Sequence, residues 1–277
     1  MRTGNASGVQ VTFLSFAVLL LAVPVSMLIG DALGSSKDEA AFIGRFVPFV
    51  LGAVALVAFP SLRRHATEFL SNPVGREYRG EVALAALSNL GVAFAAVGGV
   101  SLWYWLTEGN AALEQHLKSA PADLQMAQAF SPLGLLMSVF LAALVAPILE
   151  ELLFRGFLYR AWERQWGWFA SMLLTSTLFG LYHPHFVAAF AGSIVFVCVL
   201  RRTGSLRASI IVHSFGNLML WYPLAGQFLF PGNERALGDI ATWALNLACL
   251  LYVIVALPIY VWMARAPNRD GLRLAAA

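Results

Sequence analysis

The chain has 277 residues, of which 59% are hydrophobic and 12% are charged, and its mean hydropathy is +0.72. A soluble domain carries roughly 25% charged residues, so this composition excludes a soluble globular protein and indicates an integral membrane protein. The net charge of +3 does not indicate a nucleic-acid partner, because the arginines are spread over separate short segments and form no continuous basic stripe. The partner that the composition does imply is the lipid bilayer.

Eight apolar stretches predict an all-α, polytopic membrane protein. A membrane-crossing helix needs about 20 apolar residues, and most of the stretches approach that length. The first is interpreted as a retained span and not as a signal peptide, because only Arg2 precedes it and no small-residue cleavage site occurs before Asp31. The stretches lie near 11–30, 42–60, 83–106, 132–153, 168–184, 186–200, 208–226 and 240–263.

The distribution of basic residues predicts the orientation of these spans. When the amino terminus is placed in the cytoplasm, most of the 18 basic residues fall on cytoplasmic segments, as the positive-inside rule requires. Both termini are then cytoplasmic, and in a bacterium the protein would lie in the plasma (inner) membrane. The main polar interruptions are 62–80, expected to form an interfacial helix, and 109–129, expected to form a helical cap. Cys198 and Cys249 lack metal-site or disulfide spacing and are interpreted as packing residues.

The first candidate functional cluster follows Pro147 and contains two adjacent glutamates. A charged group at membrane depth costs about 2.5–3.5 kcal/mol on insertion scales, so such groups usually serve a site or pair with each other. Glu151 and Arg155 are four residues apart and can form an ion pair on one helix face, whereas Glu150 points about 100° away. Glu150 is therefore the candidate general base and Glu151 its support. The alternative is that all three are solvated where a helix meets the cytoplasm.

Two histidine clusters follow on the next apolar stretches. His183 precedes Pro184, which disfavours helix at the residue before it and so predicts an imidazole at a helix break. His213 and Asn217 are four residues apart and can direct two hydrogen-bond donors to a common point, as an oxyanion requires. Helix–helix packing is the alternative for both clusters. Because the three clusters lie on successive helical regions near the same predicted side of the membrane, we expect them to form one site.

At these residues the chain resembles the CPBP family, which includes the CAAX prenyl proteases and the bacteriocin-processing proteins also called Abi proteins. The family pattern is Glu-Glu-x-x-x-Arg, then Phe-x-x-x-His, then His-x-x-x-Asn, and the likeness covers roughly 145–222. It implies amino-terminal helices and loops at 1–130, a catalytic core at 131–226, and a carboxyl-terminal helix with a basic tail at 227–277. The matching residues are Glu150, Glu151 and Arg155; Phe179 and His183; His213 and Asn217; and the run Thr203-Gly204-Ser205-Leu206.

The resemblance implies an intramembrane endopeptidase with eight helices around a cavity that opens to the cytoplasm. By that resemblance Glu150 and His183 activate a water molecule, and His213 with Asn217 stabilises the tetrahedral oxyanion. The ion pair made by Glu151 then holds the helix of the first glutamate in place. The substrate is expected to be a peptide or protein, either prenylated near its carboxyl terminus or simply hydrophobic.

Two alternatives remain open at the level of the sequence. Two histidines and a carboxylate are ligand types of a zinc site, but the His-Glu-x-x-His motif is lacking, so we expect no metal and no other cofactor, with zinc as the alternative. The second alternative is a non-catalytic immunity protein, scaffold or transporter that retains the fold. A transporter usually shows internal repeats, which we do not find in this sequence.

Overall fold

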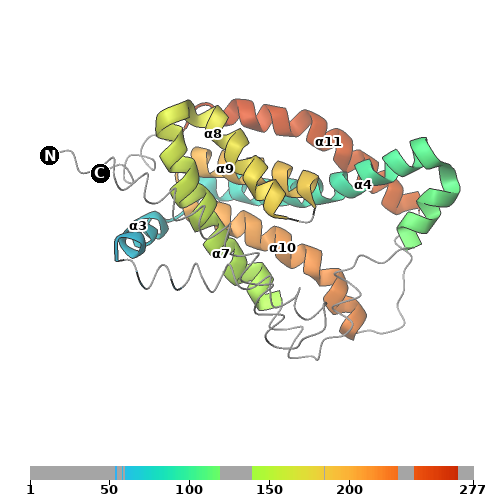
Figure 1. Cartoon of the computed structure of the whole chain (residues 1–277), viewed down its shortest axis with the longest axis horizontal. Helices are drawn as coiled ribbons and strands as arrows, with labels where there is room; N and C mark the ends of the chain where they lie inside the picture. Colours follow the sequence, from blue (N-terminus) through green and yellow to red (C-terminus); the bar gives the residue numbers. More distant parts are fainter. Residues whose placement is uncertain are drawn as a thin grey trace.

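The computed structural model describes Val54, Ala58 and residues 60–118, 139–183, 185–229 and 240–267. All regular secondary structure in these residues is helical (Figure 1), which confirms the all-α prediction. Two of the helices, η2 and η3, are π-helical, and η1 is a 3-10 turn. The helices are α3 (Pro60–Ser71), η1 (Arg76–Tyr78), α4 (Arg79–Lys118), η2 (Leu141–Val145), α7 (Ala146–Glu151), η3 (Leu152–Tyr159), α8 (Arg160–Tyr182), α9 (Phe186–Thr203), α10 (Leu206–Leu229) and α11 (Ile240–Ala264).

Three helical stretches in the described part of the chain are long and apolar enough to cross a membrane. They are Arg76–Ala112, Phe186–Thr203 and Asn246–Ala264. These stretches support an integral membrane protein, because each provides at least 18 residues of strongly apolar helix. The first predicted span, 11–30, lies outside the described residues, and the total of eight spans stays a prediction.

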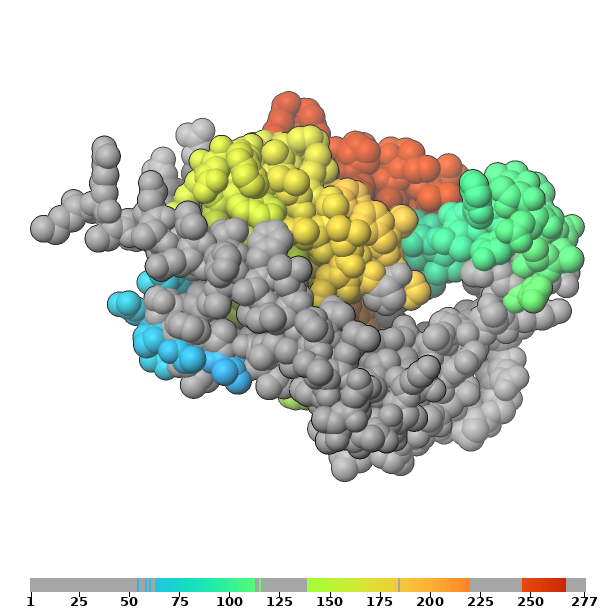
Figure 2. Space-filling view, viewed as in Figure 1, coloured from blue at the N-terminus to red at the C-terminus, as the bar shows by residue number. Residues whose placement is uncertain are grey.

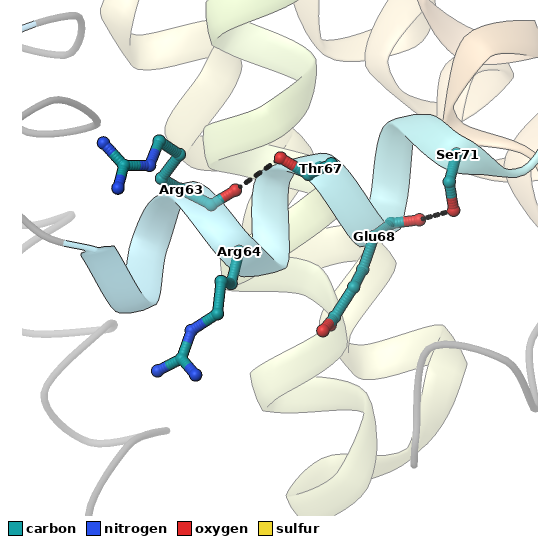
Figure 3. A pocket seen from close by; sticks show the side chains of 5 residues that line it. All are labelled: Arg63, Arg64, Thr67, Glu68 and Ser71. Atoms are coloured by element: carbon teal, nitrogen blue, oxygen red, sulfur yellow. Dashed lines mark hydrogen bonds between the residues drawn. The ribbon is translucent and has the colours of Figure 1, made fainter.

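The polar interruption at 62–80 is partly helical, as the sequence predicted. Helix α3 buries Ala66 and Phe69 on one face and exposes its arginines on the other. That outer face is slightly hollowed, and the hollow is lined by polar and charged side chains (Figure 3). The helix is therefore amphipathic, which suits an interfacial position. Its lining residues are Arg63, Arg64, Thr67, Glu68 and Ser71.

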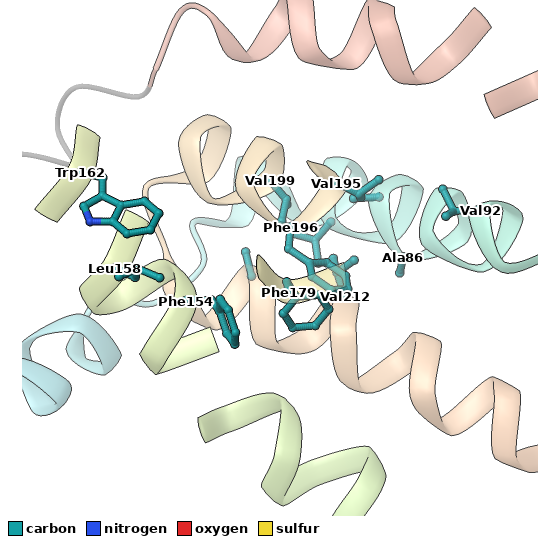
Figure 4. Close-up of a cluster of buried hydrophobic side chains, with 13 residues drawn as sticks. Ala86, Val92, Phe154, Leu158, Trp162, Phe179, Val195, Phe196, Val199 and Val212 are labelled. Atoms are coloured by element: carbon teal, nitrogen blue, oxygen red, sulfur yellow. The ribbon is translucent and has the colours of Figure 1, made fainter. Parts of the chain in front are cut away.

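Two clusters of buried apolar side chains hold the helices together. One joins α3 to η3, α9 and α11, and the other joins α4 to η3, α8, α9 and α10 (Figure 4). In the second cluster Phe179 of α8 packs edge-on against Phe154 of η3 and Phe196 of α9. Helix α9 thus contributes to both clusters, and the space-filling view shows it beside α8 on the visible face (Figure 2). This packing fixes the three helical regions that carry the candidate site.

Helices α4 and α11 lie against each other along much of their length. A Cβ atom at Gly98 would lie 2.8 Å from the backbone oxygen of Asn246, so only glycine permits this close approach. This pair packs against α9 and α10. The two long apolar helices therefore support the helices of the site from one side.

Candidate active site

Three ionisable side chains from separate helical regions meet at one place. Glu150 lies on α7, His183 follows the end of α8, and His213 lies on α10. The Oε2 atom of Glu150 is 3.6 Å from Nε2 of His213 and 3.9 Å from Nε2 of His183. That oxygen is buried and has no hydrogen-bond partner among the described residues. The structure thus brings together one residue from each of the three predicted clusters.

The three side chains of the site differ in their exposure to solvent. The side chains of Glu150 and His213 are 8% and 4% exposed, whereas that of His183 is 27% exposed. His183 has extended backbone angles, φ −106° and ψ 147°, and α8 ends directly before it. This helix end is the one that the sequence predicted from the following proline. It leaves the imidazole of His183 as the most exposed of the three side chains, next to the Glu150 carboxylate.

Glu151 lies beside the candidate base but has a different set of partners. Its Oε1 atom is 2.9 Å from Nη1 of Arg155 and 3.0 Å from Nδ1 of His213. Its Oε2 atom accepts a hydrogen bond of 2.5 Å from the hydroxyl of Ser209. The ion pair expected from the four-residue spacing is therefore present. Both Glu151 and Arg155 are fully buried, so their charges compensate each other where water does not reach.

The hydrogen bonds of the two imidazoles orient both rings toward Glu150. Nδ1 of His183 lies 2.7 Å from the carbonyl oxygen of Phe179, and a carbonyl oxygen can only accept, so Nδ1 carries a proton. Nδ1 of His213 donates in the same way to the carboxylate of Glu151. In each neutral ring Nε2 is then an acceptor. Two acceptor nitrogens and one carboxylate oxygen therefore surround a point at which a water molecule can be held by its protons.

Arg155 is itself held by a buried chain of hydroxyl groups and by aromatic rings. Its Nη2 group donates to Oγ of Ser193 at 2.8 Å, and that hydroxyl donates to Oγ of Ser176 at 2.9 Å. The guanidinium carbon lies 4.5 Å from the ring centre of Phe179 and 4.9 Å from that of Phe196. The support of Glu151 thus extends through Arg155 into α8 and α9.

Asn217 has a partner that the sequence analysis did not anticipate. One N–H of its side-chain amide donates to the carbonyl oxygen of Ala142 at 2.9 Å. Ala142 lies in a π-helical turn in which the N–H of Ala146 donates to the carbonyl of Leu141, five residues earlier. The same register would pair Ala142 with Pro147, which has no N–H. Asn217 therefore satisfies a carbonyl that the proline leaves without a donor.

This arrangement differs from the predicted pair of donors at His213 and Asn217. Both residues lie on α10, as expected, but Nδ1 of His213 is used by Glu151 and one amide N–H of Asn217 is used by Ala142. The reason is that each side chain satisfies a buried polar group on a neighbouring helix. A primary amide has two N–H groups, so Asn217 keeps one donor that makes no hydrogen bond to the described residues.

Sequence analysis missed the three serines that bind the charged residues. Ser176, Ser193 and Ser209 are all fully buried, and each lies in an apolar helix where a serine is unremarkable. Of the three, only Ser209 could have been found from the sequence, because it lies four residues before His213 and therefore on the same helix face. The other two could not be found without knowing how α8 and α9 pack.

The ligand types of a zinc site, two imidazoles and a carboxylate, lie close together here, and zinc stays an alternative. Zinc ligands lie about 2.0–2.2 Å from the metal and surround it as a tetrahedron. Among the described residues, no group of three or more His, Cys, Asp or Glu side chains is arranged to hold a metal ion.

The fold and the site together define a class, a helical membrane protein with a buried cluster of carboxylates and imidazoles. Residues 132–219 match the family described as Type II CAAX prenyl endopeptidase Rce1-like. This match agrees with the family that the motif resemblance predicted. The match includes every predicted site residue from Glu150 to Asn217. Searches of curated proteins and of solved structures each found no match to the chain.

Proposed function

We propose that this protein is an intramembrane endopeptidase that hydrolyses a peptide bond near the carboxyl terminus of its substrate. The proposal rests on the protease family of residues 132–219 and on one observation at the site. The Glu150 carboxylate has a buried oxygen without a hydrogen-bond partner in the described part of the chain, and this oxygen faces Nε2 of both His183 and His213. A buried carboxylate oxygen left without such a partner beside a partly exposed imidazole is suited to receive a proton during a reaction.

In the proposed reaction, a water molecule binds between Glu150 and His183. The water oxygen attacks the carbonyl carbon of the peptide bond while one of its protons moves to the Glu150 carboxylate. Nε2 of His183 accepts a hydrogen bond from the same water and so fixes its orientation. Glu150 later returns the proton to the leaving nitrogen as the carbon–nitrogen bond breaks, which leaves the enzyme in its original state.

The tetrahedral intermediate carries a negative oxygen that needs donors. The second N–H of the Asn217 amide supplies one of them in this proposal. His213 supplies another only when its ring carries a proton at Nε2 as well as at Nδ1, so this role belongs to the doubly protonated ring. Glu151 and Arg155 do not contact the reacting atoms in the proposal. They hold His213 and the helix of Glu150 in place.

An apolar surface beside His183 supports an apolar substrate. Leu181, Phe186 and Val187 flank His183 and are 70%, 41% and 65% exposed. Side chains of this kind can contact either a prenyl chain or the hydrophobic residues of a peptide. We propose that the substrate is apolar where it contacts this surface. A prenylated peptide is the first candidate, because the matching family is that of CAAX prenyl endopeptidases.

Cleavage of quenched fluorogenic peptides by the purified, detergent-solubilised protein tests this function. Prenylated and unmodified peptides of the same sequence are compared with wild-type protein and with Glu150→Gln. We expect wild-type cleavage and a loss of about 10²–10⁴-fold in the variant, the usual contribution of a general base. Thermal unfolding should show that Glu150→Gln remains folded, because Glu150 forms no hydrogen bond to the described residues through its buried oxygen.

The outcomes separate the proposal from its alternatives. Equal cleavage by both proteins would remove Glu150 from the reaction, and no cleavage by folded wild-type protein would favour a non-catalytic role. Preference for the prenylated peptide would identify the lipid as part of the substrate. The metal content of the same active preparation should be below one ion per molecule. Stoichiometric zinc together with inhibition by a chelator would replace the proposed water activation by a zinc mechanism.

A further inference from the structure

The described part of the chain buries three arginines, and only two of them have carboxylate partners. Arg155 pairs with Glu151, and Arg201 pairs with Glu163. Arg160 is 7% exposed, forms no ion pair with the described residues, and has a buried Nε atom without a hydrogen-bond partner. A buried guanidinium without an anion is energetically unfavourable. Arg160 is therefore expected to bind an anion, as Arg155 and Arg201 each bind a carboxylate.

One aromatic ring covers a face of the Arg160 guanidinium. Arg160 is the first residue of α8, and its guanidinium carbon lies 4.6 Å from the ring centre of Phe69 on α3. Stacking of this kind covers the flat face of the guanidinium, whereas the N–H groups lie in its plane and can still bind an anion. Burial lowers the pKa of Arg160 to about 10, so the group remains charged at neutral pH.

A second cation lies next to it, and the nearest carboxylate is occupied. Arg164 is four residues further along α8, on the same helix face, and is exposed. Glu163 accepts a hydrogen bond of 3.0 Å from the hydroxyl of Tyr159 and pairs with Arg201. Glu163 attracts Arg160 electrostatically but forms its hydrogen bond and ion pair with Tyr159 and Arg201, and neither Arg160 nor Arg164 forms an ion pair with the described residues. Two such guanidinium groups on one face of α8 favour an anion with several oxygen atoms.

The position of this pair in the helix bundle indicates where the anion comes from. Arg201, near the end of α9, donates to the carbonyl of Ala264 at the end of α11 at 2.8 Å. It also donates at 3.0 Å to the hydroxyl of Tyr159, the residue before Arg160. Helices α9 and α11 contain two of the three candidate membrane spans among the described residues, and the contacts of Arg201 and Tyr159 place Arg160 next to the ends of both spans. Lipid headgroups lie at the ends of membrane spans.

We propose that Arg160 and Arg164 bind the phosphate group of an anionic phospholipid at the junction of α3 and α8. A guanidinium can bind two phosphate oxygens at once, and basic sites between helices at a membrane surface bind lipid headgroups. The exposed face of α3, opposite Phe69, carries Arg63 and Arg64 (Figure 3), which add positive charge to the same helix. The bound lipid would pair with Arg160, the buried arginine that forms no ion pair in the described part of the chain. It would also connect α3 to the helix that continues into the candidate site.

Native mass spectrometry of the full-length protein in detergent micelles tests this site. Phosphatidylglycerol and phosphatidylcholine are titrated separately, and the affinity of the first bound lipid is compared. We expect wild-type protein to prefer phosphatidylglycerol by about tenfold, the effect of one charge-assisted hydrogen bond. Arg160→Gln should remove most of this preference, and the exposed change Arg164→Gln should reduce it by about threefold.

Arg265→Gln is the matched control. Arg265 also stacks on an aromatic ring, with its guanidinium carbon 4.1 Å from the ring centre of Trp262, but it is exposed. Its replacement should leave the lipid preference unchanged. Equal binding of the two lipids by wild-type protein, or an equal loss in Arg160→Gln and Arg265→Gln, would contradict the proposal. Displacement of the lipid by millimolar inorganic phosphate would instead indicate a site for a free ion. If Arg160→Gln does not fold, the lipid preference of Arg164→Gln tests the proposal instead, and an unchanged preference would contradict it.

Discussion

At the scale of single residues, two adjacent glutamates have opposite surroundings. Glu151 accepts hydrogen bonds from Ser209 and His213 and forms an ion pair with the buried Arg155. Glu150 has a buried oxygen that, among the described residues, faces the Nε2 atoms of two imidazoles and forms no hydrogen bond. This contrast follows from the helix, because neighbouring side chains point about 100° apart and so reach different helices. It separates the residue that we propose to be reactive from the residue that supports the site.

The hydroxyl of Ser193 should matter for activity although it does not reach the reacting atoms. Ser193→Ala removes the closer acceptor of Nη2 of Arg155, at 2.8 Å, and leaves the carbonyl oxygen of residue 193 at 3.4 Å. Weakening the hydrogen bond of a buried charged donor costs about 1–3 kcal/mol. We expect turnover to fall by about tenfold with little change in KM, because the loss acts through Arg155 and Glu151 on the position of His213. Peptide-cleavage kinetics measure this effect, and Ser193→Thr should restore part of it.

Ser171→Ala is the control for this prediction. Ser171 is also fully buried, but its hydroxyl donates only to the carbonyl of Gly167 within its own helix, at 2.8 Å. Its removal should change stability slightly and leave turnover unaffected. If both alanine variants lose activity in proportion to their stability, the chain of hydroxyl groups has no positioning role.

At the scale of secondary structure, irregular helix geometry directs the site residues. The π-helical turn before Pro147 leaves the carbonyl of Ala142 for Asn217, and the segment after Glu151 is π-helical as well. π-helical turns are rare and often occur at functional sites, because they change which side chains face one another. Helix α8 contains a further irregularity at Gly167, whose φ of 77° is readily adopted by glycine.

A double-mutant cycle between Pro147 and Asn217 can separate two roles of the asparagine. Pro147→Ala supplies an N–H that can donate to Ala142, so Asn217→Ala should cost less stability in that background than in the wild type. We expect a coupling free energy of about 1 kcal/mol, the net value of one hydrogen bond, from denaturant unfolding. The loss of turnover, about 10²–10³-fold for an oxyanion donor, should remain the same in both backgrounds.

Two results would contradict this assignment. If Pro147→Ala also rescues the turnover of Asn217→Ala, the asparagine acts only by holding the turn. If the stability losses are simply additive, the amide does not replace the missing N–H of the proline. Asn72, whose side-chain amide donates to the carbonyl of Gly204 at 2.9 Å, provides a control amide that should show no coupling to Pro147.

At the scale of the whole molecule, one end of the helix bundle collects the arginines. Arg201 connects the ends of α9 and α11 to the beginning of α8, and Arg202 pairs with Glu81 of α4 at 2.9 Å. Arg207 donates to the carbonyl of Leu70 at the end of α3. This concentration of positive charge is what the positive-inside rule predicts for a cytoplasmic surface.

Labelling with a membrane-impermeant maleimide can test that orientation. Arg164→Cys introduces a thiol at an exposed position of this end, in a background that carries Cys249→Ser. Cys198 is buried and should remain unreactive. We expect labelling in inside-out vesicles and none in right-side-out vesicles, because the predicted topology places this segment in the cytoplasm. The reverse pattern would invert the topology and place His183 on the other side of the membrane.

The sequence alone determined the helical membrane class, because composition and the length of apolar stretches reflect the solvent around the chain. It also determined the pairing of Glu151 with Arg155 and the helix end before His183, since both follow from local helix geometry and from proline. Only the tertiary structure decided which groups face Glu150 and what Asn217 binds. Those contacts join residues from separate helices, and Ser193 became visible only through packing. The unpaired charge of Arg160 likewise depends on which helices meet around it.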